Sequence, residues 1–212
     1  MAENKQSRMR GRPVDPQAQE VQKLKLISAA NRLLNSKTYK TITIREIAQL
    51  AGTKSAMISY YFGHKQGLFQ AMVTHIHQSQ PDVFSHIQQA EKPLKFFISH
   101  VLNMASNNPG LVRFIHDEIL NEQSPLSESF INAMPKAISV FLPELIKREI
   151  DKGNFRADLN PKYAAFSLMV MIMSPFVIAP IREQVWQISL HEITQPSWAE
   201  HIYNLFISGC SQ

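Results

Sequence analysis

The sequence is poor in cysteine and glycine, which disulfide frameworks and glycine-rich phosphate loops require. It has one cysteine, Cys210, and only seven glycines among 212 residues. A single cysteine excludes an internal disulfide framework and fits a reduced thiol in a cytosolic protein. No glycine-rich phosphate loop is present, and the polar amino terminus lacks the apolar stretch of a signal peptide. We therefore expect a cytoplasmic protein of one large or two small domains.

Patterns of enzyme chemistry are missing as well. His75 and His77 lie two residues apart on an expected helix and face different directions, which argues against a shared metal ion. His116, Asp117 and Glu118 are consecutive, so they also diverge on a helix, and no nucleophile accompanies them. We expect no enzyme, no metal site and no cofactor.

The charge is distributed unevenly along the chain. Residues 1–67 contain twelve Lys and Arg against four Asp and Glu, a formal charge of +8, whereas the rest has ten against thirteen, or −3. A basic segment beside an acidic one suggests a polyanionic partner, to which affinity falls as salt rises.

Residues 43–65 have the pattern of two short helices joined by a tight turn. Thr43 and Glu46 have the spacing of a capping box, which starts a helix near residue 43. Gly52 can take the left-handed conformation that the turn requires. The residues between recur at i, i+3, i+4 and i+7 on one apolar face, namely Ile44, Ile47, Ala48 and Ala51. This arrangement indicates a helix-turn-helix.

The second helix of this motif is expected over residues 55–61. It turns Ile58 and Phe62 inward, and a helix of this kind fits the major groove of B-DNA. The residues left available for the groove are Lys54, Ser55, Ala56, Met57, Ser59 and Tyr60.

The order Ile-Ala, turn glycine, short helix, Tyr-Tyr-Phe and lysine resembles the TetR family of bacterial transcriptional regulators, over residues 20–76. The resemblance implies that Thr43, Tyr61 and Lys65 contact phosphates, and that Arg45 and residues 54–60 face bases. The family's usual aromatic residue is absent at Ser59. Independently, Lys65 begins an amphipathic helix whose free amides suit a phosphate.

A basic segment precedes the first helix. Residues 1–16 lack apolar periodicity and are expected to form a flexible arm that follows the duplex. Arg10 and Arg12 flank a glycine, as in a strand that lies in a narrow A·T-rich minor groove, and generic attraction to phosphates explains them equally well.

The whole chain is expected to be all-α, since helical segments alternate with Pro, Gly and Asn and no strand pattern is convincing. A helix over residues 17–35 completes a three-helix DNA-binding domain at residues 17–67, and residues 68–212 form a larger helical domain for effector binding and dimerisation. Asn108 and Asn160, each before a proline, are expected helix caps, and Gly153 an expected helix end.

Residues 163–181 carry no charge, so by length they are a candidate membrane span. Pro175 and Pro180 interrupt the segment, and we instead expect a helix buried by its own domain and by a second subunit. The family resemblance implies a four-helix dimer interface, here from residues 161–178 and 198–207. A dimer places two reading heads ~34 Å apart on a palindrome.

The larger domain is rich in Met and Phe, which indicates either plain core or, as the resemblance implies, an apolar effector pocket. The expected ligand-binding residues are Met104, Phe114, His116, Glu118, Phe166, Met169, Met173 and Trp186. The sequence thus predicts a ligand-responsive regulator, a repressor that binds a palindromic double-stranded operator as a homodimer and is released by a small apolar effector. The alternatives are an all-helical carrier or enzyme for an apolar molecule and a membrane-associated helical protein.

Overall fold

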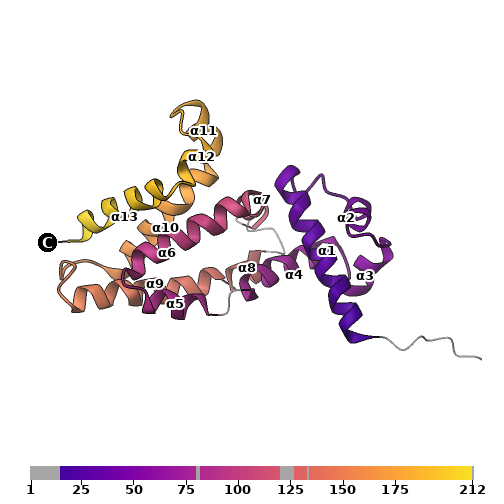
Figure 1. Ribbon diagram of the computed structural model, residues 1–212, viewed down its shortest axis with the longest axis horizontal. Coiled ribbons are helices and arrows are strands. Elements are labelled where there is room, and N and C mark those ends of the chain that lie inside the picture. Colours follow the sequence, from indigo (N-terminus) through magenta and orange to yellow (C-terminus); the bar gives the residue numbers. More distant parts are fainter. Residues whose placement is uncertain (1–14, 80–81, 120–126, 133, 212) are drawn as a thin grey trace, which may run out of the picture.

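The computed structural model describes residues 15–79, 82–119, 127–132 and 134–211, and every regular element in these ranges is a helix, as predicted (Figure 1). The predicted arm residues Arg10 and Arg12 lie outside the described residues. The elements are α1 (Pro16–Ser36), α2 (Ile44–Leu50), α3 (Ala56–Phe62), α4 (Lys65–Gln78), α5 (Val83–Gln89), α6 (Pro93–Asn107), α7 (Pro109–Phe114), the π-helical turn η1 (Ile115–Ile119), α8 (Ser127–Ile131), α9 (Met134–Asp151), α10 (Pro161–Val177), α11 (Ala179–Gln184), α12 (Leu190–Ile193) and α13 (Pro196–Cys210).

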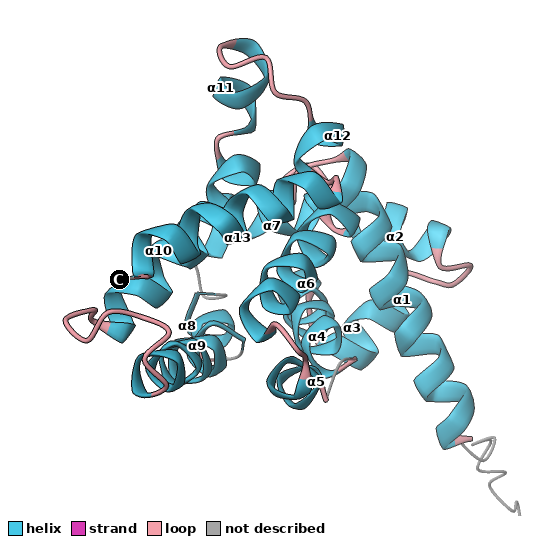
Figure 2. Ribbon diagram, turned by 60° about the vertical axis from the view of Figure 1, so that its left-hand side comes forward, coloured by secondary structure: helices cyan, strands magenta, loops and turns pink. Residues whose placement is uncertain are grey.

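Two apolar cores organise these helices. The first joins α1, α2, α3 and α4 and takes in Leu111 and Phe114 of α7. The second joins α5, α6, α9, α10 and α13. Figure 2 shows α1, α2 and α3 on one side of the molecule and α9, α10 and α13 on the other. Helices α6 and α7 thus connect an amino-terminal head to a helical body.

Local sequence signals set several helix ends as expected. Thr43 and Glu46 form both hydrogen bonds of the capping box at the start of α2. Gly52 has a φ of 65°, in the left-handed region that a residue with a side chain avoids. Asn160 accepts hydrogen bonds from the amides of Lys162 and Tyr163 and caps α10.

Asn108 behaves differently from the prediction. It precedes Pro109 at the start of α7, but its side chain makes no capping hydrogen bond. Its amide nitrogen donates instead to the carbonyl of Met104, at 3.0 Å, and its oxygen accepts from Asn31 of α1, at 3.2 Å. The side-chain oxygen of Asn108 therefore bonds to a residue 77 positions away along the chain and not to an amide at the start of α7.

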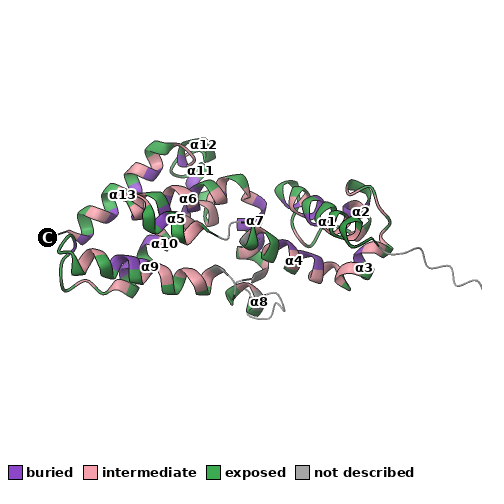
Figure 3. Ribbon diagram, turned by 60° about the horizontal axis from the view of Figure 1, so that its bottom comes forward, coloured by how far each residue is buried: buried purple, intermediate pink, exposed green. Residues whose placement is uncertain are grey.

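The uncharged segment lies within α10 and α11. Among the described residues, no helix combines the length and the apolar character that crossing a membrane requires. Buried, half-buried and exposed residues are mixed along α10, and Figure 3 shows the same mixture on α13. The buried side of α10 packs in the second core through Ala164, Ala165, Leu168 and Ile172.

Candidate nucleic-acid interface

The α2–α3 unit is anchored by a few fully buried side chains. Ile47 and Ala48 of α2 and Ile58 of α3 lie in the first core. The amide of Thr53 donates to the carbonyl of Ala48, at 2.9 Å, and closes the turn around Gly52. Because these residues turn inward, the opposite face of α3 is left to solvent.

That outer face carries the residues predicted to read bases. Lys54, Ala56, Ser59 and Tyr60 are exposed, as is Arg45 on α2. Their neighbours Ser55 and Met57 are half-buried. The ring of Tyr60 packs edge-on against that of Tyr61, with centroids 5.0 Å apart, so two aromatic rings lie together near the end of α3.

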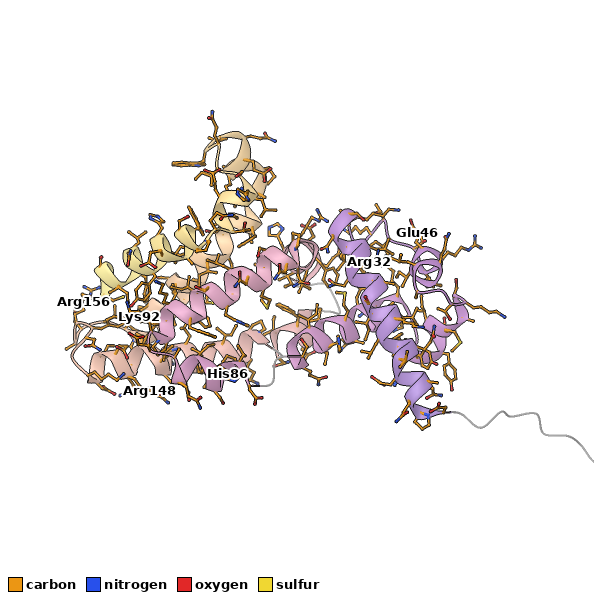
Figure 4. All side chains as sticks on the ribbon, viewed as in Figure 1. Arg32, Glu46, His86, Lys92, Arg148 and Arg156 are labelled. Atoms are coloured by element: carbon orange, nitrogen blue, oxygen red, sulfur yellow. The ribbon has the colours of Figure 1, made fainter. Side chains whose placement is uncertain are left out.

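Thr43, a predicted phosphate contact, already uses its donors in the cap. Its backbone amide and its hydroxyl both donate to Oε2 of Glu46, each at 2.8 Å. Lys37 forms an ion pair with the other carboxylate oxygen, and this ammonium, followed by the hydrogen bonds from Thr43, lowers the pKa of Glu46 to about 2. Glu46 lies on the side of the head away from the body (Figure 4). For Thr43 to donate to a phosphate, its hydroxyl must turn away from Glu46.

Lys65, the other predicted phosphate contact at a helix start, is half-buried. Its ammonium donates to the carbonyl of Tyr39 and lies 4.2 Å from the centroid of the Tyr39 ring. Burial lowers the pKa of Lys65, while the carboxylates of Glu118 and Glu46 act in the opposite direction. Lys65 thus links the start of α4 to the loop between α1 and α2.

The same loop is held from the other side by the body. Nη2 of Arg113 on α7 donates to the carbonyl of Leu34, at 2.7 Å, and to that of Lys37, at 3.3 Å. The amide of Gly110 donates to Oδ1 of Asn35, at 3.2 Å. The Arg113 side chain therefore satisfies backbone carbonyls at the carboxy-terminal end of α1, and the Asn35 side chain in turn accepts from an amide at the start of α7.

A cavity of about 420 Å³ lies at this junction, and its walls come from the α1–α2 loop and from α7 and η1. The carboxylate of Glu118 pairs with the ammonium of Lys40, at 3.6 Å. Burial and the Glu118 carboxylate both raise the pKa of the Tyr39 hydroxyl. The lining residues are Leu34, Thr38, Tyr39, Lys40, Gly110, Arg113, Phe114, His116, Asp117 and Glu118.

The structure does not bring the eight predicted ligand-binding residues together. Phe114, His116 and Glu118 lie at the junction, where the Phe114 ring packs against Tyr39 and Phe69 in the head core. Three methionines are half-buried, Met169 and Met173 against the second core and Met104 on α6. Phe166 and Trp186 are exposed by 72% and 70%.

Three residues of the junction escaped the sequence analysis, namely Tyr39, Lys40 and Arg113. No periodic pattern or motif marks them, because each acts through a partner in a distant part of the chain. Only the positions of Phe114, His116 and Glu118 pointed to this region.

Comparison with known proteins agrees with this geometry. Residues 26–72, from within α1 to within α4, match the family described as bacterial regulatory proteins, tetR family. The chain is 26% identical to the Probable HTH-type transcriptional regulator YttP of Bacillus subtilis over 174 residues, which are 79% of this chain and 83% of that protein. It is 24% identical to the HTH-type transcriptional repressor NicS of Pseudomonas putida over 140 residues, 63% of this chain and 66% of NicS.

Among solved structures, the transcriptional regulator FadR from Bacillus subtilis in complex with stearoyl-CoA is similar to the chain, with a TM-score of 0.72 at 17% identity. The similarity covers 88% of this chain and 98% of FadR. At this identity the likeness concerns the fold, a helix-turn-helix head on a helical body.

Proposed function

The chain belongs, through its amino-terminal domain, to the TetR family of bacterial transcriptional regulators, and we propose that it is a repressor released from a palindromic operator by a small, largely apolar effector. The observation that carries this function is the exposed outer face of α3, fixed from below by Ile47, Ala48 and Ile58. The formal charge of +8 on residues 1–67 suits the phosphate backbone on which such a face must dock.

In the bound complex, residues of α3 and Arg45 face base edges in the major groove, and Thr43, Tyr61 and Lys65 contact phosphates. Lys65 approaches the duplex beside the amides that open α4, where a phosphate is favoured. The basic residues Arg10 and Arg12 add contacts to phosphates or to a narrow minor groove. The base-facing residues of α3 and its preceding turn are Lys54, Ser55, Ala56, Met57, Ser59 and Tyr60.

Homodimerisation through α10 and α13 follows from the apolar side chains that these helices leave uncovered. Tyr163 and Phe166 are exposed by 74% and 72%, and Val170 of α10 and Leu205 of α13 are also exposed. A patch of this kind on a monomer marks an interaction site. Two copies joined there carry two heads, as a palindrome requires.

The effector acts from the body, residues 68–212, on a head at residues 17–67 that follows the arm of residues 1–16. Leu68, Phe69 and Met72 of α4 lie in the head core, so α4 is shared between the two parts. We assign the effector to the body, where Met104, Met169 and Met173 are half-buried and have side chains that adapt to irregular apolar ligands, while Glu118 and His116 lie where the body meets the head. NicS is a repressor and FadR a regulator seen with stearoyl-CoA, which carries a long apolar chain, and these likenesses support a repressor whose ligand has an apolar part.

The test is selection of bound duplexes from a random pool, followed by gel shifts at several salt concentrations. Arg45→Ala is expected to cost about 1–3 kcal/mol on the selected site and to relax base preference at one position of each half-site. Lys65→Ala should weaken binding to every sequence and lower the salt slope by about 1.

Lys147→Ala is the matched control, since Lys147 is exposed on α9 in the body and pairs only locally, with Asp151. It should leave affinity and salt slope unchanged. A folded wild-type chain without affinity for any duplex at low salt would contradict the proposal and favour a helical carrier.

A further inference from the structure

Residues 178–195, which we call the arm hairpin, connect α10 to α13 and include α11 and α12. Figures 1 and 2 both show this segment projecting from the rest of the molecule, on the side where α10 and α13 lie. Such a projection has few neighbours of its own, so the side chains that it presents are not there to fill the core of one subunit.

The conformation of the arm hairpin is fixed at its base by Arg182. This side chain is only 5% exposed. Its Nε donates to the carbonyl of Pro175, at 2.9 Å, its Nη1 to the carbonyl of Ile188, and its Nη2 to the carboxylate of Glu183, at 2.8 Å. One guanidinium thereby ties the end of α10 to the segment that leads back toward α12, and its charge is compensated by Glu183.

The return to α13 is fixed as well. Ser189 and Glu192 form a capping box that begins α12. Ile193 is fully buried and docks α12 onto the body. The projecting conformation is therefore specified at both ends of the hairpin.

Between these anchors the arm hairpin exposes large apolar side chains. Val185 and Trp186 at its tip are each 70% exposed, and three further residues are exposed beside them, namely Ile178, Ile181 and Leu190. A tryptophan buries roughly 150–250 Å² when it is covered, so leaving one in water forgoes a large stabilisation. Several exposed apolar side chains on a projecting segment of fixed conformation indicate a contact with another molecule.

The position of the arm hairpin in the chain indicates which molecule this is. It is continuous with α10 and α13, whose exposed residues Tyr163, Phe166 and Leu205 were assigned above to the dimer. In a two-fold dimer the same patch is used by both subunits, so a projection beside that patch faces the second subunit. The hairpin has no lysine, and its one arginine is buried, so it lacks the basic residues that hold an apolar helix on an anionic membrane.

Resting on the dimer proposed above, we propose that the arm hairpin packs Val185 and Trp186 against a second copy of this chain and so extends the α10–α13 interface. Each subunit contributes one hairpin, and the two contacts are equivalent by symmetry.

The first experiment compares Val185→Ser with Val140→Ser by sedimentation at a series of concentrations. Val140 on α9 is 65% exposed, close to the 70% of Val185. The two variants therefore make the same substitution at similar exposure, one on the hairpin and one away from it. Val185→Ser should weaken dimerisation several-fold, and Trp186→Ala at least roughly tenfold, since interfacial tryptophans are commonly hot spots. Val140→Ser should leave the dissociation constant unchanged.

A second experiment observes Trp186 directly. The chain has two tryptophans, and Trp198→Phe leaves Trp186 as the only one. The indole nitrogen of Trp198 is buried without a hydrogen-bond partner, so phenylalanine removes no hydrogen bond seen there. Trp186 emission should shift to shorter wavelength and become less accessible to acrylamide as the dimer forms.

The outcomes separate the hairpin from the dimer itself. The hairpin contact would be overturned if the protein dimerises while Trp186 stays fully accessible to acrylamide and Val185→Ser has the same dissociation constant as Val140→Ser. The α10–α13 dimer would remain. A folded chain that is monomeric at every concentration would overturn both.

Discussion

The close approach of α7 to α1 at Gly110 predicts that Gly110→Ala destabilises the protein. A Cβ atom at this position would lie 2.2 Å from the carbonyl oxygen of Leu34 and 2.6 Å from the amide nitrogen of Asn35. Ordinary contact begins near 3.4 Å, and both neighbours are backbone atoms, so α7 must move by more than an ångström. The movement also weakens the hydrogen bond from the Gly110 amide to Asn35.

The magnitude follows from three contributions. Overpacking a close contact costs about 1–3 kcal/mol. Weakening the hydrogen bond adds about 1 kcal/mol, and the better helix propensity of alanine returns up to about 1 kcal/mol. We therefore expect Gly110→Ala to lower the free energy of unfolding by about 1–4 kcal/mol.

The assay is urea unfolding followed by circular dichroism at one fixed protein concentration. Gly209→Ala in α13 is the matched control, because a Cβ there would meet nothing within 4 Å. It should be neutral or stabilising by up to about 1 kcal/mol. If Gly110→Ala unfolds at the same urea concentration as Gly209→Ala, the head and the body are not packed as closely as this geometry requires.

Three further substitutions have defined consequences. The pKa of Glu46 is lowered from 4.5 to about 2, chiefly by Lys37, so its contribution to stability is present above pH 4.5 and is lost as the pH falls through about 2. Glu46→Gln should therefore have a lower melting temperature than wild type at pH 7, and the difference should shrink as the pH falls below 4.5 and disappear below about pH 2. Arg182→Leu leaves the carbonyls of Pro175 and Ile188 without their donor, which should destabilise the hairpin by about 1–3 kcal/mol. Amide hydrogen exchange should then become faster in residues 178–195 but not in α2. Asn160→Ala removes the cap of α10 and should cost about 1 kcal/mol in thermal or urea unfolding, with equal stability arguing against the cap.

Sequence reasoning succeeded where the determining interactions are local. The capping box of Thr43 and Glu46 spans three residues, and the turn at Gly52 depends on one backbone angle. The predicted helices at 17–35, 161–178 and 198–207 lie close to α1, α10 and α13, since apolar periodicity and proline at helix starts are properties of a single segment.

Sequence reasoning failed where a side chain bonds or packs with a residue distant along the chain. Phe114 looked like an aromatic residue of the body, yet it packs in the head against Tyr39 and Phe69. Asn108 looked like a cap and bonds to Asn31 instead. Neither choice can be read from spacing, because each depends on how α7 crosses α1, which is decided by packing between residues some 75 positions apart along the chain.

If the proposed effector binds in the body, the corner between α6 and α7 offers a route by which it can act on the head. α6 packs in the body core and α7 in the head core. A displacement of α6 therefore either bends the chain at Asn108 or moves α7 as well. Asn108 bonds on one side to Met104 of α6 and on the other to Asn31 of α1, which stiffens the corner. Beyond it, α7 packs directly against the backbone of α1 at Gly110 and is joined to α1 by hydrogen bonds from Gly110 and Arg113. An effector that prefers a shifted α6 therefore also prefers a shifted α1, and the head core carries α3 with it to a new spacing between the two reading helices of the proposed dimer.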